Sequence, residues 1–136
     1  MSPKISRELA EHRLEQAKEE VVACEALYDL KLYKSANNRA YYSIFHSIRA
    51  VLALEPIDFK KHKDVIAYFN KNYIHTGVFP NEMGRKIAKA NKIREDSDYV
   101  DEFIVKEEET KEQLDTAKTL IKLVEQYIMK NGTNNE

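Results

Sequence analysis

Residues 37–52, NNRAYYSIFHSIRAVL, contain the most informative helical pattern of the chain. At about 100° per residue, the segment divides into two faces. The apolar face is expected to lie in a core and holds Tyr41, Ile44, Phe45, Ile48, Val51 and Leu52. The opposite face gathers around Arg39 and holds Tyr42, Ser43, His46, Ala50 and Ala53. Because several of these residues are small, a second helix can approach closely, and we predict a packing interface that contains a polar cleft.

Helical spacing extends over most of the chain on both sides of this segment. We predict helices over residues 5–30, 34–54, 60–75, 80–94 and 106–130, with residues 95–103, EDSDYVDEF, as a loop. Ser6 is a candidate N-cap, Gly77 is expected to end the third helix, and Pro80 opens the fourth. The sequence therefore predicts an all-α fold, an antiparallel bundle of four to five helices. We expect a single domain over residues 1–130 and a disordered tail over residues 131–136.

Composition excludes several classes of protein. The chain has 136 residues with only three Gly and three Pro, too few for a turn-rich β fold. Cys24 is the only cysteine, which excludes a disulfide framework and a thiolate-rich metal site. No stretch approaches the ~18–20 apolar residues of a membrane span, and the N-terminal sequence lacks the apolar core of a signal peptide. We expect a cytoplasmic protein that needs no metal or other cofactor.

The formal net charge of −1 hides two blocks of opposite sign. Residues 60–94 contain nine Lys or Arg and two acidic residues, whereas residues 95–116 contain ten acidic residues and two Lys. The blocks could pair with each other inside the fold. Alternatively, the basic block could form a surface that attracts phosphates. His62 and Lys63, in the run KKHKD, either contact a phosphate or RNA or simply form a solvated helix start. Cations are unfavourable at a helix N-terminus, and their presence there favours a functional role.

Arg39 and His46 are seven residues apart, so on a helix they point the same way at about 10 Å along the axis. A histidine with a pKa of ~6.5 can take or give a proton at neutral pH. An arginine can hold a phosphate and offset charge that develops on it. The pair could therefore cleave an RNA backbone without a metal. The alternative is structural: a histidine bonded to a carbonyl and an arginine paired with a carboxylate.

Three ordered elements resemble the HEPN family (higher eukaryotes and prokaryotes nucleotide-binding), and in particular its small prokaryotic uncharacterised branch. The first is residues 35–46, SANNRAYYSIFH; the second is residues 60–65, KKHKDV, followed by Phe69, Asn70, Thr76 and Gly77. The third is residues 93–99, IREDSDY, which is similar to the R-x-x-x-D-Y element that precedes the last helix of the family. We expect Arg94, Asp98 and Tyr99 to form a structural polar cluster that caps the bundle, or Arg94 or Tyr99 to edge the cleft.

The resemblance implies a helical homodimer with the motif Arg-x(4–6)-His in a cleft between the two protomers. Arg39 and His46 match this motif at its upper spacing. Many members of the family are metal-independent endoribonucleases that act as toxins, and their usual antitoxin is a minimal nucleotidyltransferase. In some systems that partner adenylylates a tyrosine two positions after the histidine, where this chain has Ile48. The polar residue often found after the arginine is replaced by Ala40, and Asn38 can substitute for it.

We therefore predict a metal-independent endoribonuclease, the toxin of a toxin–antitoxin pair, whose product carries a 2′,3′-cyclic phosphate. Arg39 holds the phosphate and His46 transfers protons. Asn38, Tyr42, His62 and Lys63 bind or orient RNA. The alternative is a non-catalytic helical module that binds a nucleotide or docks a nucleotidyltransferase through the same face.

Overall fold

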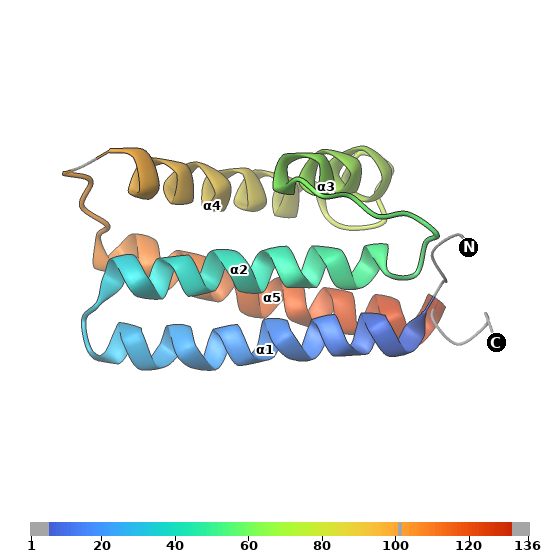
Figure 1. The fold of residues 1–136 in the computed structure, drawn as a ribbon, viewed down its shortest axis with the longest axis horizontal. Helices are drawn as coiled ribbons and strands as arrows, with labels where there is room; N and C mark the ends of the chain where they lie inside the picture. The colour runs from blue at the N-terminus through green and yellow to red at the C-terminus, as the bar shows by residue number, and fades with distance from the viewer. Residues whose placement is uncertain (1–5, 101, 132–136) are drawn as a thin grey trace.

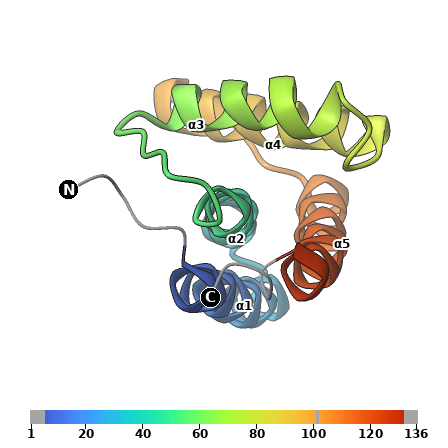
Figure 2. The same ribbon diagram turned by 90° about the vertical axis from the view of Figure 1, so that its right-hand side faces the viewer.

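The computed structural model describes residues 6–100 and 102–131. In these ranges the chain forms α1 (Arg7–Asp29), α2 (Tyr33–Leu52), α3 (His62–Phe69), α4 (Asn81–Tyr99) and α5 (Glu107–Asn131), and a π-helical turn, η1 (Asn70–Ile74), continues α3. α1 and α2 form an antiparallel hairpin with α5 beside it (Figure 1). The end-on view in Figure 2 places α2 at the centre, between the α1–α5 layer and the layer of α3, η1 and α4. The predicted all-α helical bundle is confirmed.

α1 packs on α2 through small side chains. The contact face of α2 is fully buried and consists of Ala36, Ala40, Ser43, Ser47 and Ala50, at three- and four-residue spacing. The buried face of α1 consists of Ala10, Leu14, Ala17, Val21 and Cys24. The Ser43 hydroxyl donates a hydrogen bond to the carbonyl oxygen of Ala17 at 2.8 Å, which ties the two helices at mid-length. Small residues on both helices let their axes approach closely, as the sequence predicted for this face.

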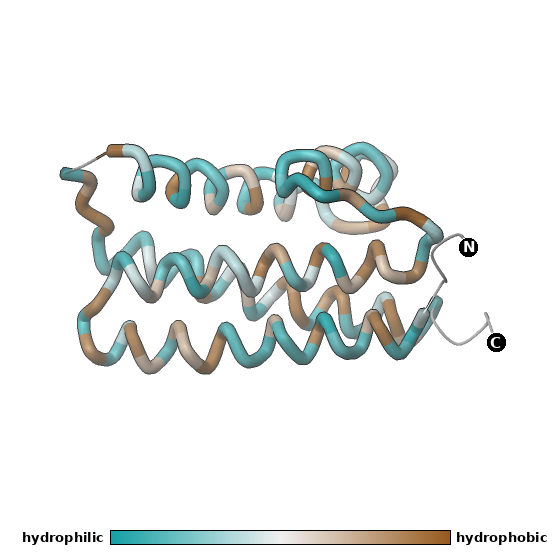
Figure 3. Tube along the Cα trace, in the orientation of Figure 1, coloured by the Kyte–Doolittle hydropathy of each residue, from teal (hydrophilic) through white to brown (hydrophobic). Residues whose placement is uncertain are grey.

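The large apolar residues of α2 point toward α5, α3 and α4. The predicted core face is confirmed, since all six of its residues are at most 6% exposed. Figure 3 shows the pattern as brown segments that alternate with teal along each helix. Phe69, Tyr73 and Phe79 stack together on the second layer. Glu55 accepts hydrogen bonds from Tyr68 and Tyr73, which fastens α3 and η1 to the end of α2.

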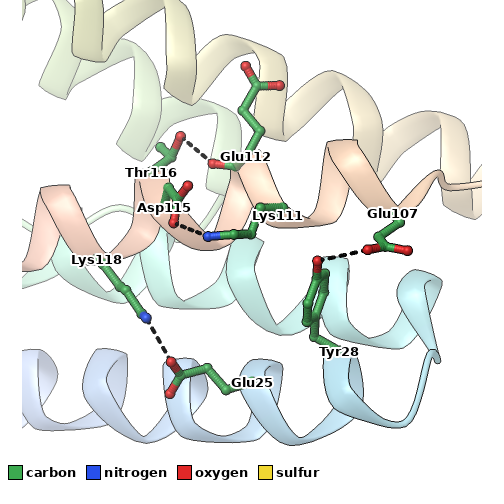
Figure 4. Close-up of polar contacts among 8 residues, drawn as sticks. All are labelled: Glu25, Tyr28, Glu107, Lys111, Glu112, Asp115, Thr116 and Lys118. Carbon is green, nitrogen blue, oxygen red and sulfur yellow. Dashed lines mark hydrogen bonds and ion pairs between the residues drawn. The ribbon is translucent and has the colours of Figure 1, made fainter.

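Polar contacts fix α5 beside α1. Lys118 pairs with Glu25 at 2.7 Å, and the Tyr28 hydroxyl donates to Glu107 at 3.2 Å (Figure 4). Exposed pairs of this kind contribute about 0–1 kcal/mol each. Their main effect is therefore on the alignment of the helices, and buried apolar area supplies most of the stability.

The two charge blocks pair with each other in part. Lys89 of α4 binds Glu112 of α5 at 2.6 Å. Within α4, Lys92 pairs with Asp96 and Arg94 with Asp98, each four residues apart. These two pairs also explain one correction to the predicted boundaries. The predicted loop at 95–99 is wrong, because the pairs and the burial of Ser97 extend α4 to Tyr99.

Two further boundaries differ from the prediction in detail. The third predicted helix is α-helical only to Phe69 and then widens into the π turn η1, which ends at Ile74. Gly77 follows three residues later with a positive φ of 82°. Asn131, the first residue of the expected tail, is the last residue of α5. The rest of that tail, residues 132–136, lies outside the described residues.

The close contact of α1 with α2 can be tested by enlarging one small residue. Ala40→Leu adds three carbons where Ala40 is 0% exposed, and overpacking of this kind costs about 1–3 kcal/mol. We expect the free energy of unfolding in urea to fall by that amount. Ala88→Leu, on the exposed side of α4, is the control and should change it by less than about 0.5 kcal/mol. Equal stability of the two variants would contradict the close packing.

Candidate functional site

Four side chains form a strip along the side of α2 that lies between α1 and the α3–α4 layer. This polar strip consists of Arg39, Tyr42, His46 and Arg49, all of which are partly exposed. Their spacing of three, four and three residues aligns them along one helix flank. α1 covers one side of α2, and α3 and α4 cover another (Figure 2). The strip borders both, because Arg39 contacts Glu20 of α1, and Tyr42 lies beside His62 of α3 and Arg94 of α4. The predicted face around Arg39 thus divides into two parts: small buried residues that pack against α1, and the larger side chains of the polar strip.

Glu20 of α1 contacts both residues of the predicted motif. The Arg39 guanidinium donates from Nη1 to Oε1 of Glu20 at 2.9 Å. His46 Nε2 lies 3.8 Å from the other carboxylate oxygen, Oε2. The Glu20 side chain is only 19% exposed, whereas that of Arg39 is 39% exposed. One carboxylate therefore holds one edge of Arg39, and the remaining guanidinium donors stay accessible to an anion.

Glu20 is a residue of the site that was not predicted from the sequence. A signal for it exists in the spacing of α1, since Glu20 and Arg13 flank the buried stripe seven residues apart, the same separation as Arg39 and His46. Arg13 donates from Nη1 to the carbonyl oxygen of Arg49 at 3.0 Å. Two charged residues of α1 thus contact the polar strip of α2 at two points along the helix, Glu20 at Arg39 and Arg13 at Arg49.

Burial lowers the pKa of His46 below its ordinary value. The Glu20 carboxylate opposes this shift, while the positive charges of Arg49, Arg13 and Arg39 add to it. His46 is therefore a neutral imidazole at neutral pH. Its Nδ1 is buried and has no hydrogen-bond partner among the described residues. His46 is thus held by packing and by Glu20, and backbone carbonyls do not fix both of its nitrogens.

His62, at the start of α3, stacks on Phe45, an apolar residue of α2 that precedes His46. Its ring centroid lies 3.8 Å from that of Phe45, with 20° between the ring planes. Its Nδ1 lies 3.3 Å from the Tyr41 hydroxyl. Burial lowers the pKa of His62, and the charge of Arg94 adds to this effect. The structure therefore brings the predicted contact His62 to the site as a neutral ring.

Arg94 reaches the same aromatic residues from α4. Its guanidinium carbon lies 5.0 Å from the centroid of Tyr41 and 5.9 Å from that of Tyr42. Asp98 pairs with it from one helical turn later, at 3.4 Å. The predicted neighbour Tyr99 is 82% exposed at the end of α4. Arg94 therefore borders the polar strip together with Asp98, while the Tyr99 side chain is not enclosed there.

The other predicted contacts lie at the margins of the site. Asn38 is partly exposed, and its side-chain oxygen is buried without a hydrogen-bond partner in the described ranges. Lys63 is exposed one residue after His62. Across residues 6–100 and 102–131, no three His, Cys, Asp or Glu side chains converge as they would around a metal ion. No helix in this part of the chain has the length and apolar character of a membrane span.

The family model of the HEPN domain matches residues 10–127, from α1 to α5. The chain belongs to the HEPN domain family. Two relatives from Methanocaldococcus jannaschii carry the word toxin in their names. "Putative toxin MJ0605" is 36% identical over 75% of this chain and 76% of its own length, and "Putative toxin MJ0142" is 31% identical over 95% and 87%. A UPF0332 protein of Thermotoga maritima is 31% identical over 78% of this HEPN chain and 85% of its own length.

The contact of Glu20 with His46 can be tested by titration. We expect the imidazole of His46 to titrate below ~6.5 in NMR spectra. Glu20→Gln should lower this pKa further, because the carboxylate favours the charged imidazolium. The control is Glu19→Gln, which removes the same charge from an exposed position of α1 and should leave the titration of His46 in place. An increase of the pKa in Glu20→Gln would contradict the geometry.

Proposed function

We propose that this HEPN protein is a metal-independent endoribonuclease whose reaction uses Arg39 and His46. The observation that carries the proposal is the state of these two side chains. His46 is a neutral base that is not locked by hydrogen bonds on both nitrogens. Arg39 is fixed at one edge by Glu20 and accessible at the others. Both side chains extend from the same flank of α2. This arrangement is needed if Arg39 is to bind the phosphate of an RNA linkage while His46 acts as the base at that same linkage.

The reaction follows from these two groups. His46 takes the proton of the ribose 2′-hydroxyl, and the 2′-oxygen attacks the adjacent phosphorus. As that bond forms, the bond from phosphorus to the 5′-oxygen breaks, and the departing oxygen receives a proton from the imidazolium of His46, which returns the histidine to its neutral form. Arg39 offsets the charge that develops on the phosphate. The product carries a 2′,3′-cyclic phosphate, and no water is consumed.

The biological setting belongs to the same proposal. We place the protein in the cytoplasm as the toxin of a toxin–antitoxin pair, and two relatives whose names contain the word toxin support this assignment. Its antitoxin would be a minimal nucleotidyltransferase. Two protomers would join so that Arg39 and His46 of both lie in one composite cleft. Asn38, Tyr42, His62 and Lys63 would contact the RNA around it.

One observation favours a second function, a binding module without catalysis. Glu20 already supplies Arg39 with a carboxylate, and the same carboxylate lies near His46. A nucleotide or a partner protein that binds this face would then use the strip only for recognition. The two functions differ in whether bound RNA is cut.

The deciding experiment incubates purified protein with total RNA in EDTA. We expect the wild type to cut RNA and leave 2′,3′-cyclic phosphate ends. His46→Ala and Arg39→Ala should each reduce the rate by about 10²–10⁴-fold, the usual contribution of a proton-transfer group or a charge donor. His75→Ala, at an exposed histidine, is the control and should retain full activity. RNA that is bound but uncut would support the binding module, and equal cutting by all variants would place the activity outside this site.

A further inference from the structure

Two arginines from different helices lie over the ring of Tyr42. Arg39 of α2 has its guanidinium carbon 5.3 Å from the Tyr42 centroid, and Arg94 of α4 lies 5.9 Å from the same centroid. The separation of the two guanidinium groups is therefore no greater than the sum of these distances. Arg39 and Arg94 are 55 positions apart in sequence, so the fold brings them together through a single aromatic ring.

The stacked position of Arg94 suits it for binding an anion. A guanidinium that lies over an aromatic ring keeps its N–H donors at the edges of its plane, where they can reach a phosphate. The side chain of Arg94 is 27% exposed, so its edges are partly accessible. Two rings, Tyr41 and Tyr42, hold it in place and limit the rotamer freedom that it would lose on binding. Asp98 occupies one edge at 3.4 Å and competes for the same charge.

We propose that Arg94 binds the phosphate next to the one held by Arg39, so that the site recognises a strand with at least two consecutive phosphates. The protein then acts on single-stranded RNA oligonucleotides, and a substrate with one phosphodiester fills only half of the site. Asp98 weakens this second contact. The position of the scissile phosphate at Arg39 is taken from the proposed function, on which this inference rests.

The first test measures binding and does not require activity. His46→Ala protein is mixed with a fluorescent oligouridylate, and its affinity is followed over a range of salt concentrations. In this background Arg94→Ala should reduce the dependence of log K on log salt by about 0.7 and weaken binding by about fourfold at physiological salt, the effect of one lost phosphate contact on a single strand. Asp98→Asn should tighten binding by about twofold or more, because a competing negative charge is removed.

The matched control is Arg85→Ala. Arg85 also belongs to α4 and is exposed, but it lies nine residues before Arg94 and so on the opposite side of the helix. Its removal should leave the salt dependence unchanged. If Arg85→Ala and Arg94→Ala weaken binding equally, the effect is general electrostatic attraction and the proposal is wrong. A tighter complex with Asp98→Asn cannot arise from partial unfolding, which separates a binding role from a structural one.

The second test compares two substrates of the active protein. A dinucleoside monophosphate contains only the scissile phosphate, whereas an oligouridylate has neighbouring phosphates. Arg94→Ala should raise the KM for the oligonucleotide and leave cleavage of the dinucleoside monophosphate unchanged. An equal loss on both substrates would make Arg94 a structural residue and overturn the inference while the proposed nuclease survives. If the wild type cuts neither substrate, the nuclease fails, and the binding test still decides the role of Arg94.

Discussion

The contact of α1 with α2 through small side chains is the constraint on which the rest of the structure depends. Ala40, Ser43 and Ala50 are fully buried, so the two helices meet without large side chains between them. At this close approach, the carboxylate of Glu20 on α1 contacts both Arg39 and His46 of α2. The same contact leaves the large residues of α2 to pack against the other helices. Core packing and site geometry therefore have a common origin.

The site offsets part of its positive charge internally, with two carboxylates for four arginines. Arg13, Arg39, Arg49 and Arg94 would repel one another on a bare surface. Glu20 and Asp98 each neutralise one of them, and the rings of Tyr41 and Tyr42 accept the faces of two. Burial meanwhile keeps His46 and His62 neutral. The excess positive charge of this surface supports the proposed binding of phosphate.

The sequence predicted the helices and the division of α2 into two faces, because helical periodicity is a local property. Arg39 and His46 were identified in the same way, as one motif on one helix. Glu20 was not, since an acidic residue beside an apolar stripe is common on any surface helix, and its seven-residue separation from Arg13 is too weak a signal to single it out. The position of Arg94 at the edge of the cleft was predicted only as one of two alternatives. Its partners could not be predicted, because the segment from Glu95 onward was taken as a loop, whereas α4 continues to Tyr99 and Arg94 lies over Tyr41 and Tyr42. Contacts between distant segments depend on tertiary packing, which periodicity does not encode.

The antiparallel hairpin of α1 and α2 has a consequence for how such a protein can diversify. Glu20, Arg39 and His46 all belong to this one hairpin, within 27 consecutive residues of the chain. His62 and Arg94 belong to the second layer, which joins the hairpin through loops and through the aromatic contacts at Phe45 and Tyr42. Substitutions in α3 and α4 can therefore alter which strand is recognised without disturbing the groups assigned to the chemistry. Under the proposed function, the second layer would carry recognition and the hairpin the chemistry, so each could change without the other.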